Sequence, residues 1–177
     1  MSAFNGTCCD ALAAIARLCE QHALGISTSI DIIEACDIES MPAPDADTNT
    51  ISGDIVVKTG KQWYNWKIGG NAEFNYNSVG SQGNQSFENI LTPFLPLVRD
   101  AITHLLNQIV NGEFVIRFSD IGGEYRLLGT EFSPAMVAEG GIQGVISAEA
   151  NGTTITFNNK GLIAYTYTGA VSYTPAA

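Results

Sequence analysis

The sequence predicts an α+β fold: a mainly antiparallel β-sandwich or barrel with one long helix packed on its side and a short N-terminal helix. Three observations lead to this prediction. Short runs of alternating apolar and polar residues, bounded by Gly, Asn and Pro, fill most of the chain after residue 28. An Asn151-Gly152 pair lies between two such runs, which is a strong hairpin signal. Only residues 92–110 keep helical spacing over four turns.

The first part of the chain is predicted to be a helical segment, residues 1–27. Within it, residues 8–22 place apolar side chains on one helical stripe, formed by Cys8, Leu12, Ile15, Leu18 and Cys19. Residues 28–177 are predicted to form a single β-rich domain, because a chain of 177 residues fits one domain by default. Its first run, residues 28–38, switches to a period of two.

The middle of the chain is predicted to hold strands and then the long helix. Strands are expected at 51–57, 62–68 and 72–78, followed by a flexible Gly/polar loop at 79–86. Thr92 is the expected N-cap of the long helix, with Pro93 in the first helical position and Asn111-Gly112 after its end. Further strands are expected after the helix, at 113–118, 124–130, 142–149, 153–158 and 162–167.

Composition excludes several classes of protein. The net charge is −10 and the eight Lys and Arg residues are scattered, which argues against a protein that grips nucleic acid. No signal peptide and no apolar run long enough to span a membrane are visible, so we expect a chain made in a cytoplasm. The four cysteines all lie in the first 36 residues, and without an export signal no disulfide framework is expected.

No catalytic, cofactor or metal motif stands out. The stretch DADTNT at 45–50 resembles the start of a calcium loop, but Thr50 and Val56 occupy the places of its Gly and its bidentate Glu. Cys19 and His22 are three residues apart and are better explained by core packing than by zinc. His104 lies off the apolar stripe and is expected on the surface. We therefore expect no enzyme, no cofactor and no metal; a hydrolase with an unrecognised carboxylate pair is the weakest alternative.

The aromatic run QWYNW contains Trp63 and Trp66 and allows two interpretations. One is a sugar-stacking platform, which would make the chain a carbohydrate-binding β-sandwich module. The other is core packing against the long helix, which we favour because consecutive strand residues point to opposite faces and cannot form one platform.

The order of elements resembles the tube fold of phage tail tube proteins. Residues 33–68 (IEACDIESMPAPDADTNTISGDIVVKTGKQWYNWKI) and 122–137 (GGEYRLLGTEFSPAMV) look like the major tail protein group of phages and prophages of Bacteroidetes-type bacteria. This resemblance covers roughly residues 30–168. It implies a structural virion protein whose copies form rings, commonly hexameric, that stack into a tube through which DNA passes without specific binding. Such a tube is assembled in the host bacterial cytoplasm and contacts other tail proteins; a tail terminator or connector is the alternative.

The acidic stretch ESMPAPDADTNTISGDI, residues 39–55, is predicted to be an arm that contacts a neighbouring subunit. Two prolines stiffen it toward an extended form, and it contains no Lys or Arg. Deleting residues 41–48 should therefore weaken assembly more than folding. The candidate interface comprises residues of this arm and of the Gly/polar loop: Met41, Pro42, Pro44, Asp45, Asp47, Ser81, Gln82 and Asn84.

Overall fold

The computed structural model of the chain describes residues 29–96, 100–119, 123–147 and 151–177. These residues are mostly β-sheet with one α-helix, so the β-rich α+β class is confirmed. The predicted helix at 8–22 and the segment 1–27 lie outside the described residues. The elements, in chain order, are β1 (Ser29–Glu34), a 3-10 turn η1 (Ala35–Asp37), β2 (Ile38–Ser40), β3 (Thr50–Ile51), β4 (Val56–Val57), β5 (Tyr64–Lys67), β6 (Gly69–Ser81), β7 (Asn84–Pro96), α1 (Asp100–Ile109), β8 (Glu113–Ser119), β9 (Tyr125–Leu128), β10 (Ala135–Ile146), β11 (Asn151–Gly161) and β12 (Tyr165–Tyr167).

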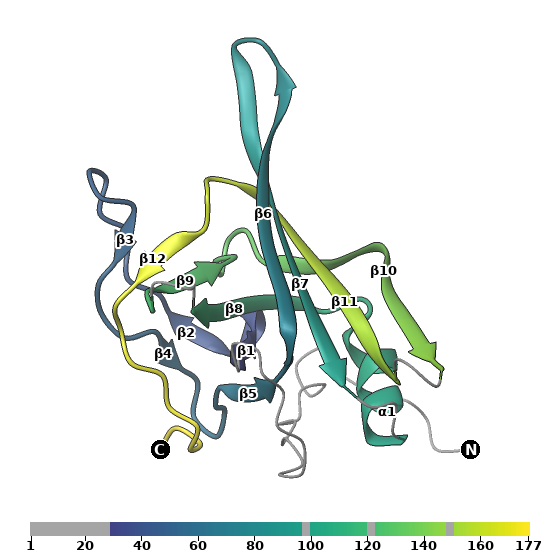
Figure 1. The fold of residues 1–177 in the computed structure, drawn as a ribbon. Helices are drawn as coiled ribbons and strands as arrows, with labels where there is room; N and C mark the ends of the chain where they lie inside the picture. Colours follow the sequence, from purple (N-terminus) through teal and green to yellow (C-terminus); the bar gives the residue numbers. More distant parts are fainter. Residues whose placement is uncertain (1–28, 97–99, 120–122, 148–150) are drawn as a thin grey trace.

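Ten of the described strands belong to one sheet (Figure 1). Its main path runs β3-β12-β9-β8-β10-β11-β7-β6, with β1 on β8 and β5 on β1. All of these pairs are antiparallel except β12 with β3. Ile68 alone separates β5 from β6, yet β5 pairs with β1 and β6 pairs with β7. The hydrogen-bonded path does not return to its start, and the predicted sandwich or barrel stays a prediction.

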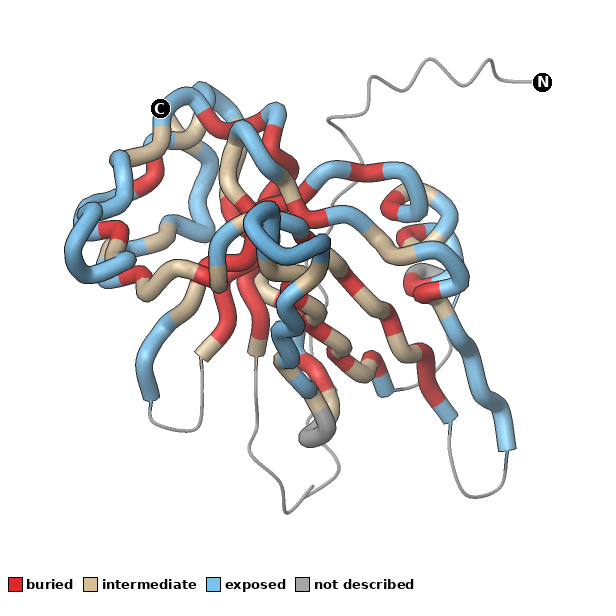
Figure 2. The backbone as a smooth tube through the Cα atoms, turned by 90° about the horizontal axis from the view of Figure 1, so that it is seen from above, coloured by how far each residue is buried: buried red, intermediate tan, exposed pale blue. Residues whose placement is uncertain are grey.

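Strands β1 and β8 are buried on both faces of the sheet, because one apolar core lies against one face and a second core lies against the other. The first core holds Ile32 and Ile116 together with the α1 side chains Ile102, Leu105 and Ile109. The second core holds the neighbouring residues that point the other way, among them Ile33, Val115 and Leu127. Burial is therefore nearly continuous along both strands, although each also contains polar residues; Figure 2 draws the buried residues in red.

The predicted start of the long helix is wrong. Residues 84–96 form β7, and α1 begins at Asp100. In β7 burial alternates, with Leu91, Pro93 and Leu95 facing inward, so a period of two wins over the helical spacing read from the same residues. Pro93 has no Cα partner in the register with either β6 or β11, and its missing N–H therefore breaks no ladder hydrogen bond there.

Two turn predictions are also corrected. The expected flexible loop at 79–86 is instead the end of the β6–β7 hairpin, closed by Gln82-Gly83, with Gly83 at φ 89°. Asn151-Gly152 is not the turn of the next hairpin but the start of β11, where Asn151 pairs with Ile146. Gly152 is required there for another reason: a Cβ atom would clash with the Phe94 ring and lie 2.6 Å from the carbonyl oxygen of Leu95.

Candidate functional site

A two-stranded ribbon projects from the sheet at the end of the β6–β7 hairpin (Figure 1). Counted toward the tip of the hairpin, Phe87 is the last residue of β7 that also pairs with a third strand, where it faces Gly161 of β11. Beyond it, β6 and β7 pair only with each other, and residues 80–86 are exposed. An isolated two-stranded hairpin is only marginally stable in water. The ribbon is therefore suited to being held by a partner, and three predicted interface residues, Ser81, Gln82 and Asn84, form its tip.

The four strands β6, β7, β11 and β10 have two open edges among the described residues. Strand β6 pairs with β7 on one side only, along its whole length. Strand β10 pairs with β8 at Ala135 and Met136 and with β11 on its other side, so residues 142–146 leave one edge free. Unpaired edges of this length offer rows of N–H and C=O groups to another strand.

The acidic arm is anchored at its base and folded at its tip. Asp45 accepts hydrogen bonds at Oδ1 from the backbone N–H groups of Asp47 at 2.8 Å and Thr48 at 3.1 Å. These two bonds hold the pKa of the Asp45 carboxyl below its ordinary value. At the base, Asn49 donates from Nδ2 to the carbonyl oxygen of Ile163 at 3.3 Å. The tip is thus a preformed turn.

The structure divides the predicted arm contacts into two groups. Pro44, Asp45 and Asp47 are exposed and remain candidates for an intermolecular contact. Met41 instead packs against the second core, and the ring of Pro42 lies beside Gly53. The arm tip and the ribbon tip both point to the upper side of Figure 1 but stand well apart in that view.

The two tryptophans are core residues. Trp66 is fully buried in the first core, which also holds the α1 side chains, and Trp63 is 1% exposed in the second core. The prediction of core packing is confirmed for both rings, and Trp66 shares its core with the helix. Neither ring is available to stack on a sugar, so the observation behind the carbohydrate-binding alternative is lost. His104 is exposed on α1, as expected.

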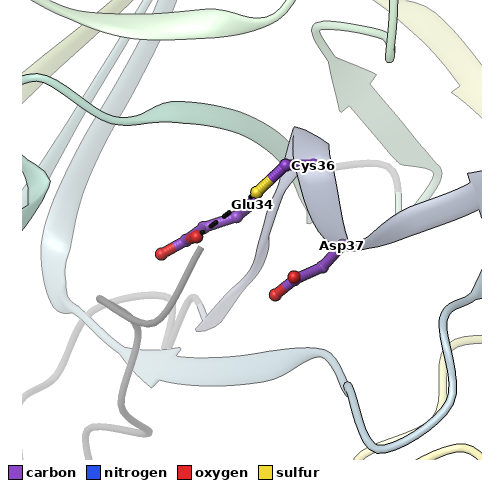
Figure 3. A group of neighbouring side chains, drawn as sticks. All are labelled: Glu34, Cys36 and Asp37. Atoms are coloured by element: carbon purple, nitrogen blue, oxygen red, sulfur yellow. Dashed lines mark hydrogen bonds between the residues drawn. The ribbon is translucent and has the colours of Figure 1, made fainter. Parts of the chain in front are cut away.

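One cluster of potential ligand atoms comprises Glu34, Cys36 and Asp37 (Figure 3). Cys36 is disulfide-bonded, contrary to the expectation that no disulfide framework forms, and its sulfur is therefore not a thiolate ligand for a metal. Because a disulfide sulfur carries no proton, the 3.6 Å between Sγ of Cys36 and Oε2 of Glu34 is a contact rather than a donated hydrogen bond. Asp37 forms an ion pair with Lys61 at 3.3 Å. The disulfide was not predicted because the expectation rested on the cellular compartment, and a compartment does not tell which sulfur atoms lie close together in the fold.

A polar network around the buried carboxylate of Asp31 joins four distant parts of the chain. Arg117 donates from Nε to Oδ2 of Asp31 at 2.8 Å, and its second nitrogen lies 2.6 Å from the same oxygen. Asn65 and Tyr173 both donate to Oδ1 of Asp31, at 2.7 and 2.8 Å. Burial and the bond to Asp31 raise the pKa of the Tyr173 phenol. Every carboxylate oxygen is satisfied, so the network reads as a structural clamp on the segment after β12.

Two of the cavities lined by described residues lack the carboxyl pair of a glycoside-hydrolysing site. The larger, of about 430 Å³, lies between residues 54–62 and 170–177, and the smaller, of about 230 Å³, lies beside Ser133 and Leu162. Asp54 is the one acidic side chain lining them, and its Oδ1 accepts the N–H of Ala170 at 2.7 Å. Acid–base hydrolysis of glycosides needs a carboxyl pair, which these linings lack.

Comparison with known proteins adds no relative. No family model, no curated protein and no solved structure matches the chain. Within the described ranges, no helix has the length and apolar character needed to cross a membrane.

Proposed function

We propose that the chain is a structural virion protein that assembles with copies of itself into stacked rings and forms a phage tail tube, as the sequence resemblance implies. The observation that carries this proposal is the four-stranded sheet β6-β7-β11-β10 with its two open edges. Self-assembly removes such edges from solvent, because each edge pairs with the complementary edge of the next copy.

The directions of the strands favour a closed ring. Neighbouring strands in this sheet are antiparallel at each of its three pairings. With four strands, the two edge strands β6 and β10 therefore run in opposite directions. A copy rotated about an axis along the strands brings its β10 beside β6 of its neighbour in antiparallel order, and repeating this heterologous contact closes a ring. In this proposal the sheets of successive copies form one barrel, and the first core and α1 lie on one face of it.

The charges on these strands suit a channel for DNA. Three acidic residues, Glu73, Glu88 and Glu139, lie on the four strands, and the one basic residue there, Lys160, has its Nζ 3.9 Å from Oε1 of Glu88. A wall of this kind offers phosphate groups no unpaired cation to hold them. This supports passage of DNA without specific binding, with the virion as the place of function and other tail proteins as further partners.

Electron microscopy of the purified protein tests the proposal. We expect rings of uniform diameter, hexameric by the resemblance, and tubes built from them. A tail terminator or connector would give rings that do not extend into tubes. Protein that stays monomeric by light scattering at high concentration would contradict the proposal.

A pair of edge variants tests the ring contact itself. In an antiparallel strand, neighbouring residues turn their N–H groups to opposite sides, so one of Gln143 and Gly144 points its N–H to the free edge of β10. One of Gln143→Pro and Gly144→Pro is therefore expected to abolish rings while tryptophan fluorescence stays native. The other should disturb β11 pairing and lower stability. Rings formed normally by both variants would exclude this edge as the contact.

A further inference from the structure

Three large apolar side chains are exposed where the ribbon meets two neighbouring loops. Phe132 in the β9–β10 loop is 89% exposed, Leu162 in the β11–β12 loop is 62% exposed, and Tyr76 on β6 is 53% exposed. Single exposed apolar residues are ordinary, but a group of them on adjoining segments marks an interaction surface. We call these three residues the apical patch.

Hydrogen bonds show that the three segments adjoin. Tyr76 faces Asn89 across β6 and β7, and Asn89 faces Asn159 of β11. Asn89 donates from Nδ2 to the carbonyl oxygen of Leu162 at 2.7 Å, which ties the β11–β12 loop to this row. Asn159 donates to the carbonyl oxygen of Ser133 at 2.7 Å, which ties the Phe132 loop to the same row.

Hydrogen bonds within the chain hold the two loop backbones beneath the patch. Asn89 is fully buried and Asn159 is 9% exposed. Asn89 also accepts the N–H of Ala164 at 3.3 Å, and Ser133 donates from Oγ to the carbonyl oxygen of Lys160 at 3.2 Å. Two buried amides are thus satisfied by the loops that carry Phe132 and Leu162. Ordering these loops in advance lowers the entropy lost on binding.

A second group of exposed apolar side chains lies at the other end of β11, where β11 pairs with the end of β10. Ile146 is 76% exposed and Val145 is 48% exposed at the end of β10. Ile146 pairs with Asn151, the first residue of β11, whereas Leu162 directly follows its last residue. At about 3.3 Å per residue, the length of β11 separates the two spots by roughly 36 Å. An apolar surface therefore lies at each end of β11.

Charge favours head-to-tail contact between copies over head-to-head contact. The acidic arm flanks the apical patch, because Asn49 at its base bonds to Ile163 beside Leu162. Two apical patches facing each other would bring Asp45 and Asp47 of both copies together, with no Lys or Arg in residues 39–57 to offset them. Like charges brought together across an interface oppose association.

We propose that the apical patch docks on the Val145–Ile146 end of a second copy of this chain, head to tail. The inference rests on the proposed function, in which this is the contact between successive rings. It adds the residues that make the contact and an axial repeat set by β11 and its flanking loops, of about 40 Å.

Mixing of variant rings tests the inference. The apical variant carries Phe132→Ser and Leu162→Ser, and the basal variant carries Ile146→Ser. Each is expected to form rings that do not stack. Preformed apical-variant and basal-variant rings mixed in equal amounts should give pairs of rings but no longer stacks, because each pair uses the one intact contact. Val56→Ser removes another exposed apolar side chain, 48% exposed on β4, and should stack like the wild type.

The outcomes separate this inference from the proposed function. Normal stacking by the apical variant, or an absence of paired rings in the mixture, would overturn the patch while leaving ring formation standing. Wild-type protein that forms single-file strings lost in the apical variant, without closed rings, would support the patch and overturn the ring. Wild-type protein that never associates would overturn both.

Discussion

The most demanding prediction concerns the buried ion pair between Arg117 and Asp31, which we would break with Arg117→Met. Methionine keeps most of the apolar stem but leaves the carboxylate of Asp31, 4% exposed, without its cation. Removing one partner of a buried pair typically costs about 3–5 kcal/mol of unfolding free energy. Two neutral donors, Asn65 and Tyr173, still bond to Asp31. We therefore expect the lower end of that range, about 3 kcal/mol, or a fall in Tm of roughly 6–12 °C.

Urea unfolding followed by tryptophan fluorescence measures this loss. Trp63 and Trp66 lie in different cores, so one signal reports on both. The double variant Asp31→Asn/Arg117→Met removes both charges and keeps an acceptor for the remaining donors, so its loss should fall to about 1 kcal/mol. Lys67→Met, on the exposed end of β5, should stay within about 0.5 kcal/mol of wild type.

Either of two results would contradict this prediction. A loss below about 1 kcal/mol for Arg117→Met would mean that Asp31 is not desolvated as its burial indicates. A double variant no more stable than Arg117→Met would mean that the cost comes from lost packing, including the contact of the guanidinium 4.3 Å from the centre of the Tyr125 ring, rather than from a stranded charge.

Three further predictions concern Tyr173 in the segment after β12, Gly152 and the acidic arm. The raised pKa of Tyr173 favours the protonated phenol in the folded state, so the stability that this phenol contributes is present below pH 10 and lost as pH rises through the folded pKa. Tyr173→Phe should be about 1 kcal/mol less stable than wild type at pH 7. In urea titrations, this variant should also lack the part of the stability loss at alkaline pH that comes from Tyr173. Gly152→Ala should lower stability by about 1–3 kcal/mol because its Cβ meets Phe94, whereas Gly144→Ala, with its nearest atom at 3.9 Å, should be tolerated; equal thermal melts would contradict this. Replacing residues 43–48 by two glycines, which keeps Met41 in the second core, should reduce assembly in light scattering without lowering the midpoint of unfolding; a lowered midpoint with normal assembly would make the arm a folding element.

The parts of the fold that were predictable from sequence are those where one local pattern dominates. The alternation of apolar and polar residues in 72–78 places that part of β6 correctly, and the β-branched and aromatic residues of 113–118 place β8 correctly although both of its faces are buried. Residues 92–96 were misassigned because their apolar positions and prolines fit a helix N-terminus as well as a strand, and only the register with β6 and β11 decides between the two. Asn151-Gly152 looked like a turn because a glycine needed for its missing Cβ cannot be told from one needed for its backbone angles.

The candidate surfaces divide in the same way. Exposure of the arm tip follows from its composition, and so it was predictable. The open edges of β6 and β10 and the apical patch depend on which strands are neighbours, and no local pattern encodes that. In the sequence, Phe132 looks like any other loop residue. Its place in the apical patch follows from the hydrogen bond between Asn159 and Ser133, which holds the loop beside β11.

The clamp around Asp31 also sets the order of events during synthesis. Its four members lie on β1, β5, β8 and the segment after β12, and Tyr173 stands 142 positions after Asp31. A ribosome adding about 5–20 residues per second leaves the buried carboxylate incomplete for many seconds after β1 emerges. The sheet can reach its final stability only once nearly the whole chain is available, so the edges of β6 and β10 are exposed on a nascent chain that is not yet locked. Unpaired edges on an incompletely folded chain invite premature pairing, so under the proposed assembly these edges would have to stay unpaired until Tyr173 completes the clamp.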